Sequence, residues 1–315
     1  MSASPVLCVG ILVADVFVPP LERLPAAGEL ISTEDFLLQP GGCAANTAIV
    51  LGRLGVRAAV CGRVGDDLLG EFVERDLRAR GIDTSGIRRT EGAATSKTVI
   101  VPVVGEDRRF IHTFGANAAL TAEDIDADAL EAAEAIYVGG YLILPSLGAD
   151  ELAERLREAR ARGTRIVLDV AVPAGQSLSL DAAAPLLPLA DYFVPNDDEA
   201  FALTGERDPR RQAERFLEHG ANAVLIKLGE RGVYVRDRDV ELEMHAPPLQ
   251  AVEPSGAGDA FAAGLMLGLL EGWELERSVR FACVIGGSAC TALGCWAGVF
   301  TRAEAEEFIA ANPEF

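Results

Sequence analysis

Short apolar runs alternate along this chain with stretches whose apolar residues recur at helical spacing. A strand buried on both faces reads as a continuous apolar run, because helices cover both sides of a parallel sheet. The predicted strands are Pro5–Leu12, Ala58–Val64, Ala135–Val138, Arg165–Val170, Tyr192–Pro195 and Ala223–Lys227, with a hairpin of Gly232–Val235 and Glu241–His245. The predicted helices are Cys43–Leu54, Leu68–Arg80, Ala149–Arg162, Pro209–His219, Ala257–Gly272, Leu275–Leu293 and Arg302–Ala311. The pattern predicts an α/β fold, a three-layer α/β/α sandwich with a mainly parallel central sheet.

Four β-rich runs interrupt the alternation and predict a small antiparallel sheet that stands off the main body as a lid. They are Thr95–Val104 and Arg108–Phe114, joined by Gly105–Asp107, together with Val13–Val18 and Leu30–Leu38. The chain has no internal repeat and no long linker, so the lid is predicted as part of one domain. We therefore expect a single domain over residues 1–315, with lid excursions at about 13–38 and 92–116.

The charge of the chain limits the partners that it can bind. With 28 basic and 48 acidic residues the formal net charge is −20, which is unfavourable for contact with nucleic acid or anionic membranes. The acidic residues fall mostly on predicted helix exteriors, such as Glu151, Glu154 and Glu158, and indicate a solvated surface. Any anionic ligand must therefore be met by local donors or by a metal.

Neither the cysteines nor the N-terminal residues indicate export or a membrane. Six cysteines without a CxxC pair lie mostly in apolar stretches, which is typical of buried thiols in a reducing cytosol and predicts a cytoplasmic protein. The apolar start, Val6–Val18, has no preceding basic residues, is interrupted by Asp15 and is too short to span a bilayer. We interpret it as a core strand.

The most informative motif is a glycine-rich turn that opens an apolar helix. In Gly256–Gly258 the side chains are absent or a single methyl, so successive backbone N–H groups can converge on a ligand where the helix begins. These donors and the helix dipole favour an anion. Asp259, beside the same point, could accept a hydroxyl proton while the amides stabilise a phosphoryl group. Phosphoryl transfer to an alcohol is the chemistry that this arrangement favours.

A second glycine cluster, Gly41–Asn46, also precedes a helix. Gly41 and Gly42 would let a ligand sit close to the backbone, and the Asn46 amide offers both a donor and an acceptor, which suits a molecule with hydroxyl groups. Asp15, at the end of the first strand, is a plausible second hydroxyl acceptor. A close-packed turn is the alternative for the two glycines.

Two more polar segments follow predicted strands at the edge where α/β sheets bind ligands. Asn196–Glu199 could position phosphates and water bound to magnesium, or could form a helix capping box, and the two roles are compatible. Lys227–Gly232 could line a nucleotide or form a plain β-turn. The chain contains no GxxxxGK[ST] loop, so ATP would not be held by a Walker-type loop. The three histidines lack metal-ligand spacing.

In chain order these motifs resemble those of the ribokinase-like carbohydrate kinases, the phosphofructokinase-B family. The two signature regions of that family match Gly41–Asn46 and Gly256–Phe261. Matches at Gly62–Asp67, Asn196-x-x-Glu199 and Lys227–Gly229 lie between them in family order, so the likeness covers nearly the whole chain.

The resemblance implies an ATP-dependent sugar kinase that uses Mg²⁺ and transfers the γ-phosphoryl group to a hydroxyl of a small carbohydrate. The lid would close over the sugar and exclude water. The resemblance implies that Asp259 is the base and that the anion hole is formed by Gly256, Ala257 and Gly258. It implies that the sugar is bound by Asp15, Gly41, Gly42 and Asn46. The implied nucleotide-binding residues are Asn196, Glu199, Lys227 and Gly229, and Glu199 would act on the metal through water.

Three positions depart from the family pattern. Glu253 stands where the family usually has an aspartate that is associated in some members with a monovalent cation, which leaves a potassium requirement open. Cys43 replaces a lysine common in ribokinases, and Cys283 replaces an asparagine common near the adenine. Both replacements weaken the expectation of ribose as substrate.

Other functions were weighed against the sugar kinase. A nucleoside kinase of the same fold could stack a base on Phe17, Phe110 or Phe114, although these residues fit the core of the lid. A non-catalytic ligand sensor would not need Asp259, and an NAD-dependent dehydrogenase would need a GxGxxG after the first strand, which is absent. Apolar residues alternating over 99–103 suggest pairing between two lids, so a homodimer is possible.

Overall fold

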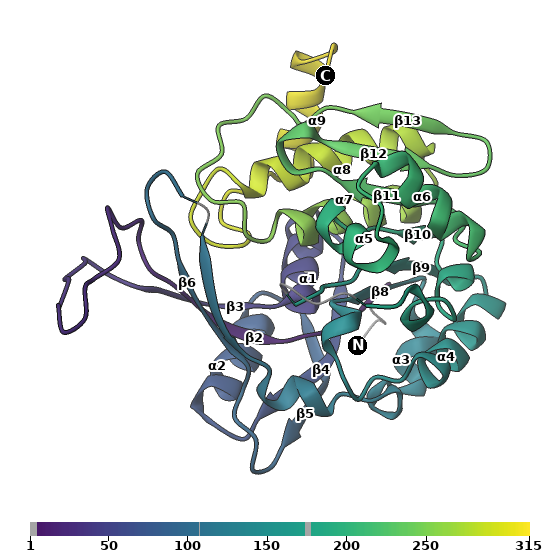
Figure 1. The fold of residues 1–315 in the computed structure, drawn as a ribbon. Helices are drawn as coiled ribbons and strands as arrows, with labels where there is room; N and C mark the ends of the chain where they lie inside the picture. The colour runs from purple at the N-terminus through teal and green to yellow at the C-terminus, as the bar shows by residue number, and fades with distance from the viewer. Residues whose placement is uncertain (1–4, 107, 174–177) are drawn as a thin grey trace.

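The computed structural model describes residues 5–106, 108–173 and 178–315, and the statements below concern these residues (Figure 1). The strands of the main sheet are β1 (Val6–Gly10), β4 (Ala58–Gly65), β5 (Asp83–Thr90), β8 (Ala135–Gly139), β9 (Arg165–Leu168), β10 (Tyr192–Phe193), β11 (Val224–Lys227), β12 (Val233–Arg236) and β13 (Glu241–Met244). The lid strands are β2 (Val13–Phe17), β3 (Leu37–Gly41), β6 (Lys97–Val101) and β7 (Arg109–Thr113). The α-helices are α1 (Cys43–Arg53), α2 (Leu68–Ala79), α3 (Ala127–Ala132), α4 (Ala149–Ala161), α5 (Asp197–Thr204), α6 (Pro209–Glu218), α7 (Ala257–Glu271), α8 (Leu275–Ala289) and α9 (Arg302–Ala311).

The main sheet has the order β13-β12-β11-β10-β9-β8-β1-β4-β5 in the described residues. All neighbours from β5 through β11 are parallel, and β12 and β13 add an antiparallel edge. This confirms the mainly parallel sheet and the hairpin that the sequence predicted. Because the strands are parallel, their carboxyl ends meet at one edge, where α/β proteins place ligand-binding groups.

Two hydrophobic cores lie on opposite faces of this sheet. Side chains alternate along a strand, so Val6 and Cys8 of β1 pack with α1, α2, α7, α8 and α9, while Leu7 and Val9 pack with α3, α4, α5 and α6. Helices on both faces explain why the strands read as continuous apolar runs (Figure 1). The three-layer sandwich predicted from the sequence is confirmed.

The lid is a four-stranded sheet of order β3-β2-β6-β7, set to one side of the body (Figure 1). The strand register places two rows of side chains on its opposite faces. The polar row is Gln39, Asp15, Thr98 and His112, and the apolar row is Leu38, Val16, Val99 and Ile111. Asp15 is 6% exposed and Gln39 is 3% exposed, so the polar row faces the body.

The structure corrects several details of the lid. It is a mixed sheet, since β2 pairs with β6 in parallel, which the long connection between these strands allows. The strand expected at Leu30–Leu38 begins only at Leu37, and Asp15 lies within β2 instead of ending the first strand. Part of the predicted turn at Gly105–Asp107 lies outside the described residues, because residue 107 is not described.

Elsewhere the differences are at polar or glycine-rich segments. Strand β5 was not predicted, because Asp83–Thr90 is a largely polar edge strand that lacks the apolar run of a central strand. Helix α8 ends at Ala289, four residues earlier than predicted, where Cys290 caps it and an irregular segment begins. Element boundaries of this kind depend on caps and tertiary contacts.

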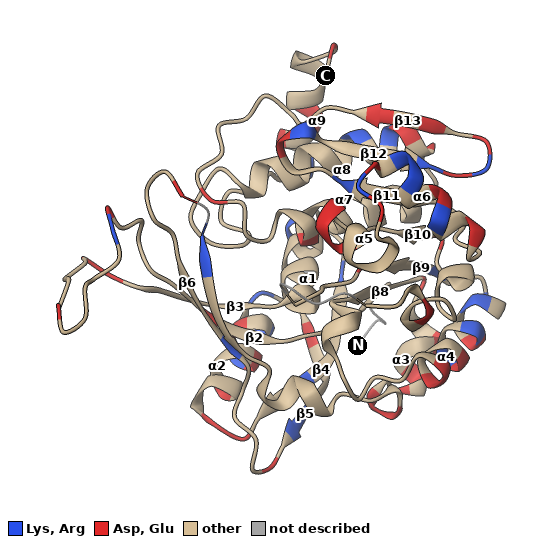
Figure 2. Ribbon diagram, viewed as in Figure 1, with Lys and Arg blue, Asp and Glu red and all other residues tan. Residues whose placement is uncertain are grey.

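Acidic residues are spread over many helices and along β13 (Figure 2). Glu151, Glu154 and Glu158 of α4 are all exposed, as expected. Within the described ranges, no helix is long and apolar enough to cross a membrane.

Candidate active site

Helix α7 starts at Gly256, which has a left-handed backbone conformation that only glycine adopts easily. Gly256 has φ 78° and ψ −4°, and a Cβ added there would lie 2.3 Å from the carbonyl oxygen of Cys295. At the first residues of α7, Ala257 carries only a methyl group and Gly258 no side chain, and the Ala257 amide donates to the Pro254 carbonyl at 3.3 Å. The helix start therefore has the geometry of an anion-binding site.

Asp259 lies in the first turn of α7 and is held by side chains from two other elements. Asn46 of α1 donates from Nδ2 to Asp259 Oδ2 at 2.8 Å, and the Tyr137 hydroxyl of β8 donates to Oδ1 at 3.3 Å. Burial raises the pKa of Asp259 above its usual range, while the hydrogen bond from Asn46 and the charge of Lys227 oppose the rise. A fixed carboxylate with a raised pKa is a suitable general base.

Lys227 places a positive charge beside the same point. Its Nζ lies 3.0 and 2.9 Å from the two carboxylate oxygens of Asp169, and a Cβ added to Gly258 would lie 3.2 Å from Nζ. Burial lowers the pKa of Lys227, but the carboxylates of Asp169 and Glu199 raise it by more. The ammonium group therefore stays charged next to the start of α7.

Asp169 and Tyr137 are site residues that the sequence analysis missed. Asp169 directly follows β9 at the carboxyl edge of the sheet, which is a signal that could have been used. Tyr137 is fully buried, and its hydroxyl lies 3.3 Å from Asp169 Oδ2 as well as from Asp259. Nothing in the apolar run of β8 distinguishes Tyr137 from a core residue, so its role depends on the tertiary structure.

The second glycine cluster lies on the lid side of Asp259. A Cβ on Gly41 would lie 1.8 Å from Asp15 Oδ2, and a Cβ on Gly42, whose φ is 88°, would lie 2.5 Å from the Ile11 carbonyl oxygen. Asn46 Oδ1 is buried and has no hydrogen-bond partner among the described residues. The close-packed turn that was the alternative for these glycines is therefore present, and the ligand contact stays a prediction.

Asp15 is a buried acid, and few polar groups stabilise its charged form. Burial raises its pKa to about 7, while a hydrogen bond from Thr98 opposes the rise and the charge of Asp259 adds to it. Thr98 Oγ1 is in turn 2.9 Å from His112 Nδ1. These three residues connect the site to the outer edge of the lid along the polar row.

We expect Asp15→Asn to stabilise the ligand-free protein. The pKa of Asp15 rises from 3.8 to about 7 on folding, so stability falls as the pH rises through this window. The limit is about 4 kcal/mol at about 1.4 kcal/mol per pKa unit, and altered hydrogen bonds reduce the expected gain to about 2 kcal/mol. Urea unfolding at pH 8 measures this gain, which should shrink toward pH 4.

The exposed lid residue Asp35 supplies a matched control, and Asp35→Asn should leave the free energy of unfolding within about 0.5 kcal/mol. Equal stability of Asp15→Asn and wild type at pH 8 would contradict a buried, uncompensated Asp15 carboxylate.

Asn196 and Glu199 form a complete capping box at the start of α5. Asn196 Oδ1 accepts from the Glu199 amide at 2.8 Å, and Glu199 Oε2 accepts from the Asn196 amide at 2.7 Å. Burial raises the pKa of Glu199 to about 7, and the charge of Lys227 opposes this rise. The backbones of Asn196 and Lys227 also form a parallel β-bridge at the ends of β10 and β11. The cap leaves Glu199 Oε1 and Asn196 Nδ2 for other ligands.

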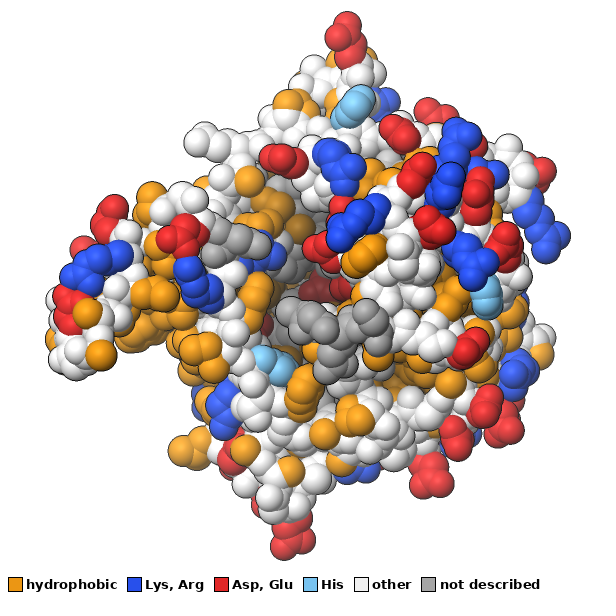
Figure 3. All heavy atoms as spheres, in the orientation of Figure 1, with side chains coloured by type: hydrophobic (Ala, Val, Ile, Leu, Met, Phe, Trp, Pro, Cys, Tyr) orange, Lys and Arg blue, Asp and Glu red, His pale blue; other side chains and the backbone are white. Residues whose placement is uncertain are grey.

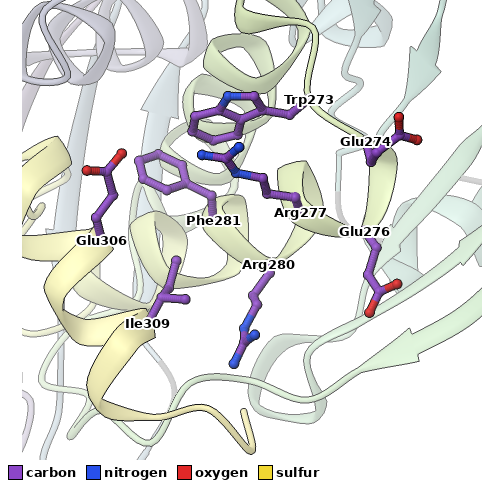
Figure 4. Close-up of a pocket in the computed structure, with 8 residues that line it drawn as sticks. All are labelled: Trp273, Glu274, Glu276, Arg277, Arg280, Phe281, Glu306 and Ile309. Atoms are coloured by element: carbon purple, nitrogen blue, oxygen red, sulfur yellow. The ribbon is translucent and has the colours of Figure 1, made fainter.

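A hollow lies between the lid and the body (Figure 3). Figure 3 shows acidic side chains at its base, with the largely apolar lid on one side. A separate cavity of about 410 Å³ lies between α8 and α9 (Figure 4). It is lined by side chains such as Trp273 and Arg280 and by none of the predicted site residues, so the candidate site is the hollow. The nearby turn at Gly229, with φ 60°, ends β11 as expected.

A glycine turn at a helix start, a fixed buried carboxylate and a lid sheet are features expected of an α/β phosphotransferase that acts on an alcohol. A model of the pfkB family of carbohydrate kinases matches residues 3–301. The 2-dehydro-3-deoxygluconokinase of Bacillus subtilis is 30% identical over 296 residues, covering 90% of this chain and 91% of the relative. The ribokinase of Haemophilus influenzae is 28% identical over 287 residues, with 90% and 91% covered.

The fold is shared with solved structures. A ribokinase-type protein from E. coli in complex with ATP and Mg²⁺ has a TM-score of 0.82 at 24% identity, covering 98% of this chain and 99% of the other. The chain belongs to the pfkB family of carbohydrate kinases and has the ribokinase fold. It is thus a phosphotransferase with an alcohol acceptor, as the motifs predicted.

Proposed function

We propose that the protein transfers the γ-phosphoryl group of ATP to a hydroxyl of a small sugar, with Asp259 as the general base. The observation that carries this proposal is the position of the Asp259 carboxylate, fixed by Asn46 and Tyr137 at the start of α7 beside Lys227. The sugar oxygen bonds to the γ-phosphorus as its proton passes to Asp259. The bond between that phosphorus and the bridging oxygen breaks, and ADP leaves.

The sugar side of the hollow is assigned to the residues that present open polar atoms. Asp15 would accept a hydrogen bond from one sugar hydroxyl, and Asn46 Oδ1 would accept one from another while Nδ2 holds Asp259. Gly41 and Gly42 keep the backbone close enough for this contact, since a methyl group at either position would meet protein atoms. The lid would exclude water, which favours transfer to the sugar over hydrolysis.

The nucleotide side is assigned to the carboxyl ends of β10 and β11. Gly256, Ala257 and Gly258 would donate amides to the transferred phosphoryl group, with Lys227 as its counter-charge. Mg²⁺, bound together with ATP, would offset the negative charge of the phosphates. Glu199 Oε1, left free by the cap, fits a water on that ion. Gly229 lies after Lys227 and lines the nucleotide in this proposal.

The acceptor is tested by ADP release across ribose, fructose, a 2-dehydro-3-deoxy sugar acid, inositols and nucleosides. We expect at least one sugar to give turnover well above the ATPase background. A flat response to every alcohol would contradict the kinase and favour a sensor. Phe17 is fully buried in the lid core and cannot stack on a base, whereas Phe110 and Phe114 are 54% and 40% exposed and, contrary to expectation, do not belong to that core.

We further propose a homodimer that pairs the apolar rows of two lids. Ile111 and Leu38 of this row are 68% and 42% exposed, and an apolar lid face of this size is costly in water. Ile111→Glu should place two like charges in the interface and shift the mass in light scattering toward the 33.2 kDa of one chain. Val240→Glu, at an exposed apolar residue of the β12–β13 turn, should leave the mass unchanged.

A single-chain mass for the wild type would contradict this dimer and leave the kinase assignment untouched.

We also propose that the protein works in the cytoplasm and binds no nucleic acid. Its six free thiols, whose pKa burial raises in every case, and its net charge of −20 support both points.

A further inference from the structure

An ion pair joins the lid to the segment that leads into the anion hole. Arg108, which directly precedes β7, places Nε 3.3 Å from Glu253 Oε1. The Glu253 side chain is 3% exposed, and that of Arg108 is 23% exposed. Glu253 lies three residues before Gly256, so this contact connects the lid to the start of α7.

Glu253 fixes the turn that sets the anion-binding amides. Its Oε1 accepts from the Ser255 amide at 3.0 Å and from Ser255 Oγ at 2.7 Å. Its own amide donates to the Cys290 carbonyl at 3.0 Å. Both bonds to Ser255 end on the same oxygen that faces Arg108. The orientation of Ser255, and hence of Gly256, therefore depends on where the Glu253 carboxylate lies.

The Glu253 carboxylate needs the arginine as a counter-charge. Its second oxygen, Oε2, is buried and has no hydrogen-bond partner in the part of the chain that the structure describes. A buried carboxylate that loses its neighbouring cation is strongly destabilised, so without Arg108 the Glu253 side chain would move toward water. This movement would weaken the two hydrogen bonds to Ser255, because both of them end on the Glu253 carboxylate.

We propose that Arg108 is a positioning residue that couples closure of the lid to assembly of the anion hole. With the lid closed, its guanidinium holds Glu253, and Glu253 holds Ser255 and the amides of Ala257 and Gly258 in their working geometry. With the lid open, the turn is loosened and the γ-phosphoryl group is not activated toward water. The proposal rests on the kinase function proposed above.

A neighbouring arginine provides a matched control. Arg109, the next residue and the first of β7, pairs with Glu106 at the surface, where the two side chains are 44% and 53% exposed. Arg109→Ala removes the same charge from the lid without touching the α7 segment. Differences between Arg108→Ala and Arg109→Ala therefore report on the contact with Glu253.

We expect Arg108→Ala to lower kcat about 10- to 100-fold, with KM for the sugar changed less than about threefold, because binding groups stay in place. Millimolar guanidinium chloride should restore part of the lost kcat, and tetramethylammonium chloride should not. Arg108→Lys should retain more kcat than Arg108→Ala, since it keeps the charge but loses the planar fork. A kcat for Arg108→Ala within about twofold of Arg109→Ala would overturn the proposal.

Two further measurements keep the test decisive if activity is low. In the double variant with Glu253→Gln, the kcat losses of the two substitutions should not multiply, whereas multiplying losses would count against coupling. Hydrogen exchange needs no sugar: the amides of Ser255 to Asp259 should exchange at least about tenfold faster in Arg108→Ala than in Arg109→Ala. Equal exchange overturns the positioning role even if no sugar is phosphorylated, and a failed sugar screen alone overturns only the kinase function.

Discussion

Asp259→Asn is expected to cut kcat by a factor of about 10²–10⁴ with the best sugar from the screen. The amide keeps the shape of the side chain and its contact with Asn46, but it cannot accept the hydroxyl proton as the new bond to phosphorus forms. Binding of ATP should change less than about threefold, because the anion-binding amides and Lys227 are untouched. Steady-state kinetics and nucleotide titration measure the two effects separately.

The same base sets the pH dependence. Because burial raises the pKa of Asp259, kcat/KM of the wild type should fall as the pH drops through this raised value, and the base is active above it. Asp128→Asn is the matched control, since Asp128 also lies in the first turn of a helix but is exposed and distant from the hollow. Near-normal turnover of Asp259→Asn would refute the assignment of the base.

Lys227→Met is expected to lower kcat about 10²–10³-fold by removing the positive charge beside the transferred phosphoryl group. Lys227 also lowers the pKa of Asp259, so its loss should move the acidic limb of the kcat/KM profile to higher pH. If Lys227 only lined the nucleotide, the substitution would raise KM for ATP and leave this acidic limb in place. The pH profile therefore separates a catalytic from a binding role.

The only other lysine of the chain, Lys97 in lid strand β6, supplies the control. Lys97→Met should keep both kcat and the position of the acidic limb. If Lys227→Met changes only KM for ATP, the original expectation that Lys227 lines the nucleotide stands and the role at the phosphoryl group is wrong. Asp169→Asn gives a further check, because it removes the partner that holds Lys227 Nζ at 2.9 Å.

The sequence by itself determined the layered fold and the family. Continuous apolar runs predicted buried parallel strands because both faces of the sheet are covered, and the glycine turns before α1 and α7 predicted close approach of a ligand to the backbone. These signals are local, since they depend on neighbours a few residues apart. They also placed Asp259, Asn46 and Glu199 on the correct segments, whereas Asp15 lies in lid strand β2 and not at the end of the first strand.

The tertiary structure alone decided which of these groups act together. Tyr137, Asp169 and Lys227 come from three strands far apart in the sequence, and only the order β11-β10-β9-β8 brings them to Asp259. The polar edge strand β5 and the pairing of Arg108 with Glu253 likewise depend on contacts across long stretches of chain. Charge interactions act through space, so their partners and the resulting pKa values follow from three-dimensional packing and not from spacing along the chain.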